Sequence, residues 1–165
     1  MNRSRVLALV GAALTVSACN PFRSPFKQEP VVRVSQGDVN ANLRWNGVLA
    51  TPAGLAGAVQ IKGVATMAPG SNAANTAVNV NLSNATPGGL HPWQLHRGQC
   101  GADEGVWGSQ DEYKALKVDE YGRVSASVTV PVVMPTTGLY YVSVSASAAN
   151  PETIVACGNL APPGR

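Results

Sequence analysis

The sequence predicts an all-β domain, an antiparallel sandwich or barrel, preceded by an export segment and a tether. Residues 77–83, 124–130 and 140–146 alternate apolar and polar side chains, which is the period of a strand with one buried face. Residues 58–67 show a similar pattern. Turn residues, chiefly Gly next to Pro, separate these stretches, and no later segment keeps a helical period. Short strands joined by turns are typical of a sandwich or barrel.

Composition places the chain among ordinary globular proteins. It has 165 residues, of which 45% are hydrophobic and 13% charged, enough for one domain with a packed core. The formal net charge is +3, from 12 basic and 9 acidic residues. Removing Arg3 and Arg5 with the export segment leaves ten basic against nine acidic residues, a net charge of about +1. No basic stretch remains, so binding of nucleic acid is not expected.

Residues 1–18 have the pattern of a bacterial export signal. Arg3 and Arg5 precede an apolar run at 6–16, which is too short for a stable transmembrane helix. The run leads into Val16-Ser17-Ala18-Cys19, which resembles a bacterial lipobox. The resemblance implies cleavage before the Cys and lipid on its thiol and new amine, which anchors the chain to a membrane. An ordinary cleavage site followed by an incidental Cys is the alternative.

The expected location is the bacterial cell envelope, where lipid on Cys19 holds the protein to the membrane. Asn20, rather than Asp, follows this Cys and favours the outer membrane, facing the periplasm, in an organism that has one. Residues 19–55 contain scattered prolines and are expected to form a lipidated tether. Residues 56–162 are expected to form the β-domain.

The other two cysteines lie in segments that carry a family resemblance. Lipid on Cys19 leaves Cys100 and Cys157, which can pair in an oxidising compartment. Residues 88–101 read GGLHPWQLHRGQCG, and residues 153–160 read TIVACGNL. Together these segments resemble the copper/zinc superoxide dismutase family. The matching residues are Gly89, Leu90, His91, His96 and Cys100 in the first segment and Ala156, Cys157 and Gly158 in the second.

The resemblance implies a fold and a disulfide. Members of this family form a Greek-key β-barrel of eight antiparallel strands, and spacing and motif order match over about residues 56–160. A Cys in the position of Cys100 pairs with one in the position of Cys157. The resemblance therefore predicts a Greek-key barrel closed by a bond between these two residues.

The same resemblance implies that the family's metal sites are lost in this chain. Four imidazoles hold the family's copper, but the first His of its H-x-H pair is replaced here by Gln94, and His96 alone remains as a vestigial position. A later copper ligand falls on Ser145. The bridging His and the zinc ligands should lie within residues 101–123, which contain no His, and the steering Arg falls on Ile154. The resemblance thus implies an inactive homologue without a metal cofactor.

Elementary chemistry agrees with that implication. The chain has two His, whereas redox copper and zinc sites need three or four nitrogen, sulfur or carboxylate donors. Gln94 and His96 share one strand face, and His91 has the opposite parity, so the imidazoles form no chelate. We expect His96 to be hydrogen-bonded or solvent-facing, so that its replacement by Ala changes stability little. We expect His91 to be packed and hydrogen-bonded.

The remaining polar residues are expected to be structural. Six acidic residues are interpreted as solvated loop charges, with weak divalent-cation binding as the alternative. Trp93 and Trp107 are interpreted as anchors in the core or a loop. The strand serines are expected on the outer face and not as nucleophiles, because no Gly-x-Ser-x-Gly motif and no His at a useful spacing is present. The acidic residues are Asp103, Glu104, Asp111, Glu112, Asp119 and Glu120, and the serines are Ser125, Ser127, Ser143 and Ser145.

These observations predict a cell-envelope lipoprotein whose dismutase-like domain is metal-free and non-catalytic, a binding or structural module with an unknown envelope partner. The sequence does not firmly separate this domain from a chordin-type domain, which belongs to a similar barrel family without the dismutase ligands. One rival is a divergent dismutase or a periplasmic copper-binding protein. Another is an envelope glycan- or peptide-binding module that uses Trp107 and Tyr113. The candidate copper ligands of the first rival are His96, His91, Met67 and Met134.

Replacing Cys19 with Ser tests the anchor. Because a single thiol carries the lipid, the Cys19→Ser chain should leave the membrane fraction or remain an uncleaved precursor, as measured by fractionation and by the mass of the chain. A Cys100→Ser control keeps Cys19 and should stay with the membrane. A Cys19→Ser chain that is processed normally and still sediments with membranes would contradict the lipid anchor.

Overall fold

The protein is all-β in the part of the chain that the structure describes. A computed structural model describes residues 43–58 and 60–163. This part contains no α-helix, and its only helical turns are the three-residue 3-10 segments η1 (Ala53–Leu55) and η2 (Gln110–Glu112). No helix within it is long and apolar enough for a membrane crossing. Cys19, Asn20 and the export signal lie outside the described residues.

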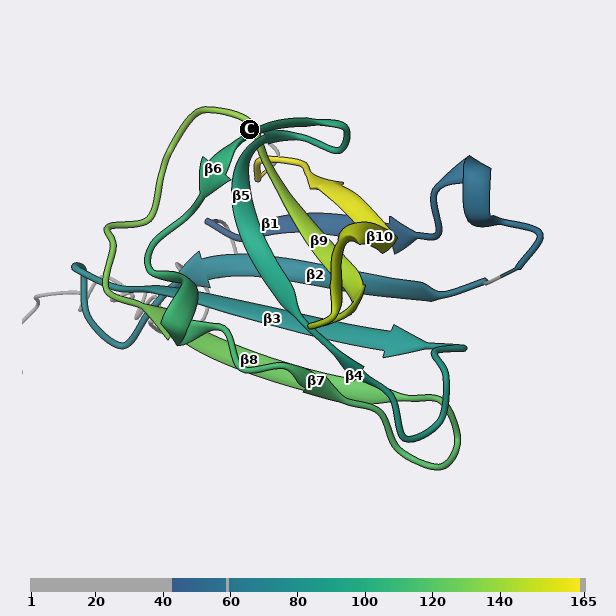
Figure 1. The fold of residues 1–165 in the computed structure, drawn as a ribbon. Helices are drawn as coiled ribbons and strands as arrows, with labels where there is room; N and C mark the ends of the chain where they lie inside the picture. Colours follow the sequence, from purple (N-terminus) through teal and green to yellow (C-terminus); the bar gives the residue numbers. More distant parts are fainter. Residues whose placement is uncertain (1–42, 59, 164–165) are drawn as a thin grey trace, which may run out of the picture. The chain divides into compact units, whose positions relative to one another are not determined.

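One curled, antiparallel sheet forms most of the domain, a half-barrel (Figure 1). Its eight strands follow the order β6-β5-β9-β10-β1-β2-β3-β8, and β4 and β7 form a separate two-stranded ribbon. The strands are β1 (Trp45–Ala50), β2 (Lys62–Pro69), β3 (Thr76–Ser83), β4 (Leu90–His91), β5 (Trp93–Gln99), β6 (Ala102–Val106), β7 (Leu116–Lys117), β8 (Val124–Val130), β9 (Tyr140–Ser147) and β10 (Asn150–Leu160).

Alternation in the sequence identifies three of these strands. The stretches at 77–83, 124–130 and 140–146 form β3, β8 and β9. The fourth stretch, 58–67, begins in a turn, and its strand β2 starts only at Lys62. Strand β6 forms inside the segment expected to be an acidic loop, because the chain turns back at Cys100 and pairs with β5.

The sheet begins before residue 56, where the sequence predicts the β-domain to start. Strand β1 lies between β10 and β2 and pairs with β2 along its whole length, from Trp45 opposite Met67 to Ala50 opposite Lys62. Trp45 and Leu49 are fully buried. Part of the expected tether is therefore a central strand of the sheet, held by the burial of these two side chains.

The core lies inside the curl of the sheet. Inward side chains of β5 and β9 pack in one cluster with those of β1, β2 and β3. Burying each Val or Leu side chain contributes about 1.5–3 kcal/mol relative to leaving it exposed. The side chains with the least exposure are Trp45, Leu49, Ile61, Met67, Val78, Val80, Leu95, Leu116, Val130, Val142 and Val144.

Two glycines allow neighbouring strands to approach closely. A Cβ atom on Gly63 would collide with the Asn81 carbonyl oxygen, and one on Gly158 would collide with the Val48 carbonyl oxygen. Only a residue without a side chain fits at such crossings. These contacts lie on β2 and β10, on either side of β1, and favour the curl of the sheet.

A disulfide joins Cys100, at the turn between β5 and β6, to Cys157 on β10. The two residues are 57 positions apart in the chain, and their Cα atoms are 6.0 Å apart. The backbone N–H of Cys100 also donates to the Asn159 side-chain oxygen at 2.8 Å. The expected pairing of these cysteines is confirmed, and the two links fix the β5–β6 turn against β10.

Removing the disulfide should destabilise the domain. A Cys100→Ser/Cys157→Ser double variant should lose about 2–5 kcal/mol of unfolding free energy in urea, because the unfolded chain gains freedom. The reduced wild-type domain is the control and should match the variant. Thiol labelling of a native, unreduced form that begins at residue 20 should find no reactive cysteine. Two reactive thiols there would contradict the pairing.

Candidate functional site

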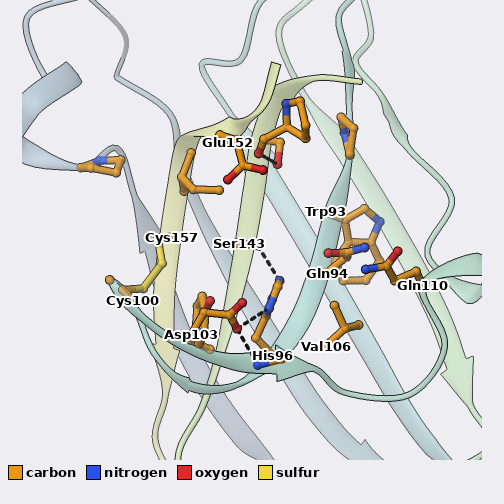
Figure 2. A pocket seen from close by; sticks show the side chains of 18 residues that line it. Trp93, Gln94, His96, Cys100, Asp103, Val106, Gln110, Ser143, Glu152 and Cys157 are labelled. Carbon is orange, nitrogen blue, oxygen red and sulfur yellow. Dashed lines mark hydrogen bonds and ion pairs between the residues drawn. A yellow bond between two sulfur atoms is a disulfide. The ribbon is translucent and has the colours of Figure 1, made fainter. Parts of the chain in front are cut away.

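A cavity of about 880 Å³ lies on the outer face of the sheet (Figure 2). Strands β5, β9 and β10 form its floor. The segment from Cys100 to Val106, which includes β6, forms one wall, and the residues around Glu152 at the start of β10 form another. The disulfide lies at its edge. The cavity therefore combines three strand surfaces with a turn that is covalently fixed to one of them.

The register between β5 and β9 places polar side chains in this cavity. Gln94 lies opposite Ser143, and His96 lies opposite Tyr141. All four line the cavity. Their neighbours along each strand alternate to the other face, where Leu95 and others pack into the core. The prediction that Gln94 and His96 share a face is confirmed.

His96 is the centre of the polar network. The residue is 8% exposed, and its ring stacks on Tyr141, with ring centroids 4.8 Å apart. Nδ1 lies 2.8 Å from Asp103 Oδ1, and Nε2 lies 3.0 Å from Ser143 Oγ. Because a carboxylate only accepts hydrogen bonds, a neutral imidazole here carries its proton on Nδ1. Nε2 then accepts from the Ser143 hydroxyl. His96 is hydrogen-bonded as expected, but it is not solvent-facing.

Asp103 orients this imidazole from β6. Its Oδ1 also accepts from the backbone N–H of Gly105 at 2.9 Å. That hydrogen bond, with a further contribution from His96, lowers the pKa of the Asp103 carboxyl, so the group stays ionised at neutral pH. Burial, with the Asp103 carboxylate nearby, raises the pKa of Tyr141 to about 12. Asp103 is solvated as expected, with its side chain 54% exposed, but it lies on strand β6 and contacts His96 and is therefore not only a loop charge.

The structure brings together the positions that the family resemblance singles out. Gln94, His96, Ser145 and Ile154 all line the cavity, and Ile154 lies opposite Ser145 in the β9–β10 register. None of the replacements supplies an imidazole or a cation. The Ser145 hydroxyl donates to the Pro151 carbonyl oxygen at 2.8 Å.

His91 lies outside this group. It belongs to β4, and its Nδ1 is 3.0 Å from the Ser145 carbonyl oxygen, while the ring is buried. It is packed and hydrogen-bonded as expected, although its Nε2 has no partner. It does not line the cavity that holds His96.

The donor set does not fit the metals of the family. Residues 43–58 and 60–163 contain no group of three or more His, Cys, Asp or Glu placed to hold an ion. The single imidazole in the cavity already uses both nitrogens. Met67 is fully buried in the core and cannot join it, and the thiols of Cys100 and Cys157 are bonded to each other. Copper and zinc sites need more donors than this cavity offers.

Trp93 and Trp107 pack as anchors, as the sequence predicts. The Trp93 side chain is buried and donates from Nε1 to the Lys114 carbonyl oxygen at 2.9 Å. Trp107 packs edge-on against Tyr140. Tyr113 is also buried, and its hydroxyl donates to the Trp107 carbonyl oxygen at 2.6 Å. Tyr113 therefore offers no open face on which a glycan could stack.

Sequence reasoning missed the link between His96, Ser143 and Asp103. Ser143 is an outer-face strand residue as expected, but it is only 6% exposed, in the lining of the cavity. Along the chain, Ser143 lies 47 positions from His96, and Asp103 lies seven positions from His96. Local spacing rules do not reach such contacts. The family resemblance could have supplied the signal, because it assigned His96 and Ser145, two residues away from Ser143, to one copper site.

Comparisons with protein-family models and with curated proteins identify no relative of this chain. No protein-family model and no curated protein matches the chain. The dismutase resemblance therefore depends on the residues of the two cysteine segments.

Replacing His96 with Ala should now cost stability, contrary to the expectation from sequence. The change removes two hydrogen bonds and a stacked ring and leaves the Ser143 hydroxyl without its partner. The unfolding free energy in urea should fall by about 1–3 kcal/mol.

Gln94→Ala is the matched control for this change. It truncates a side chain on the same strand face for which the described residues offer no hydrogen bond, and it should change stability by less than about 0.5 kcal/mol. Equal urea midpoints for the wild type and His96→Ala would contradict the structural role of the imidazole. A chelator should alter neither result.

Proposed function

We propose that the chain is an envelope lipoprotein that carries a metal-free, dismutase-type Greek-key barrel and uses it as a binding or structural module without dismutase activity. The observation that carries this proposal is the cavity on β5, β9 and β10. Its lining includes the three positions that the resemblance assigns to copper ligands and the one that it assigns to the steering cation. They are occupied here by Gln94, His96, Ser145 and Ile154.

The strand order supports a Greek-key connectivity. Strands β3 and β5 are joined by a short link through β4, yet they lie on opposite sides of the β10–β1 pair in the sheet. Strands β8 and β9 also follow each other along the chain, and they too lie on opposite sides of the β10–β1 pair in the sheet. Such long crossings between antiparallel strands are the mark of Greek keys. The position of the disulfide supports the dismutase type.

The charges around the cavity argue against superoxide as a substrate. Asp103 and Glu152 line it, and its described lining contains no Lys or Arg. Figure 2 shows Asp103 beside His96 and Glu152 at the far side of the cavity. Carboxylates at the entrance repel an anion, whereas steering needs a positive field. The position that would supply a cation holds Ile154.

The size and lining of the cavity support binding. Its volume lies within the range of small-molecule sites, and it combines apolar residues such as Pro92 and Ile154 with polar groups on one floor. Two carboxylates with no Lys or Arg in the described lining favour a neutral or cationic ligand. Lipid on Cys19 would keep this cavity close to a membrane surface in the envelope.

Metal analysis with a dismutase assay tests this proposal. Protein purified after growth with copper and zinc should retain no zinc through dialysis and show no dismutase activity above that of free copper. The physical reason is that one imidazole with both nitrogens engaged gives at best weak, exchangeable binding. His96→Ala is the control. Tight one-to-one copper, with activity that His96→Ala abolishes, would restore the dismutase hypothesis.

A further inference from the structure

We propose that Ser143, His96 and Asp103 form a nucleophile, general base and orienting carboxylate that cleave a small carboxylic ester in the cavity. This inference goes beyond the proposed function, which requires binding alone. The absence of dismutase chemistry does not depend on it.

The three side chains form an unbroken hydrogen-bonded chain from three different strands. Ser143 Oγ on β9 lies 3.0 Å from His96 Nε2 on β5, and His96 Nδ1 lies 2.8 Å from Asp103 Oδ1 on β6. Figure 2 shows both contacts within the cavity lining. A hydroxyl in contact with an imidazole, which is held from behind by a carboxylate, is the arrangement that activates a serine nucleophile.

The base is held in one orientation and one tautomer. Tyr141 stacks on one face of the His96 ring, at 22° between the ring planes. The Gly105 N–H fixes Asp103 Oδ1, and the disulfide at Cys100 fixes the turn that carries β6. With its proton on Nδ1, His96 presents the Nε2 lone pair to the Ser143 hydroxyl. This is the state that a general base needs before it takes a proton.

Gln94 is placed to support a substrate carbonyl. Its backbone lies directly opposite Ser143 in the β5–β9 register, and its side chain lines the same cavity. Among the described residues, no hydrogen bond engages its amide. A side-chain amide can donate to the oxygen that becomes negative when a nucleophile adds to a carbonyl. One such donor gives slow turnover, so a reactive ester is the suitable test substrate.

The reaction balances with water as the only co-reactant. Ser143 Oγ bonds to the ester carbonyl carbon while its proton passes to His96 Nε2. The tetrahedral intermediate then loses its alkoxy group, which takes that proton and leaves as an alcohol. Water next gives a proton to His96 and adds to the acyl carbon. The bond to Ser143 breaks, its oxygen regains the proton, and a carboxylic acid leaves.

The charges of the cavity define the substrate class. Asp103 and Glu152 line it without a Lys or Arg, so an ester that carries another negative group is disfavoured. The volume of about 880 Å³ accepts an acyl chain of a few carbons together with its alcohol. The expected substrates are therefore small esters that are neutral or positively charged.

Covalent labelling of the full chain in detergent tests the nucleophile. A fluorophosphonate should attach to Ser143 Oγ, with the P–F bond broken and fluoride released, and mass spectrometry of peptides should locate it there. The same protein should hydrolyse p-nitrophenyl butyrate faster than buffer does. The Ser143→Ala variant should lose both the adduct and the hydrolysis.

Ser125→Ala is the matched control, because Ser125 is also a strand serine, on β8, but does not line the cavity. It should keep both the label and the activity. Asp103→Asn tests the positioning role. It should lower kcat by about 100-fold or more with KM and melting temperature nearly unchanged, because the wrong tautomer of His96 is then held.

Two results would overturn the proposal. One is a folded wild-type chain, judged by its melting curve, that gives no adduct at Ser143 under an excess of probe. The other is an adduct that forms equally well in Asp103→Asn. In both cases the three residues would be a structural network. The metal analysis described for the proposed function would be unaffected, so the two failures can be told apart.

Discussion

The register between β5 and β9 is the constraint on which both the core and the cavity depend. Trp93 and Leu95 point inward beside Val142 and Val144, while Gln94 and His96 point outward beside Ser143. A slip of one residue would exchange the two faces and bury the imidazole among apolar side chains. Each buried Val or Leu side chain contributes about 1.5–3 kcal/mol, and several of them together outweigh the about 0.5–1.5 kcal/mol of one hydrogen bond. Burial of the core side chains thus determines the β5–β9 register. This register in turn determines where the polar side chains of the cavity lie.

A second constraint brings Asp103 to that geometry. The β5–β6 pairing shifts register between His96 and Gly98, where the backbone adopts a φ of 93°. A Cβ on Gly98 would also collide with the Ala102 carbonyl oxygen, so only glycine fits this tight return. Bulges of this kind redirect the side chains that follow. Here the returning strand presents Asp103 to His96, and the disulfide holds the turn in place.

The sequence predicts the fold class well and the candidate site in part. Clean alternation identifies β3 and β8, because each has one face more buried than the other. It also identifies β9, although both faces of that strand are buried from Tyr140 to Val144. Strand β1 escapes the same rule, because Gly47 interrupts it and Val48 faces solvent with 75% exposure. The positions that the motif resemblance singles out, Gln94, His96, Ser145 and Ile154, line one cavity. The resemblance does not point to Asp103 or Ser143, which meet His96 only when β6 and β9 pair with the two sides of β5. Local spacing does not encode this pairing.

The geometry also explains why the two kinds of chemistry considered for His96 exclude each other. Asp103 fixes the proton on Nδ1, so the imidazole has a single lone pair, on Nε2. A metal ion and the Ser143 hydroxyl would compete for that lone pair. A metal ion could displace the Ser143 hydroxyl from Nε2 only if further imidazoles also bound the ion, because one neutral nitrogen binds copper or zinc weakly in water. Gln94 and Ser145 offer none. Once the chelate is absent, the hydroxyl is the better partner, and the imidazole is free to act as a base.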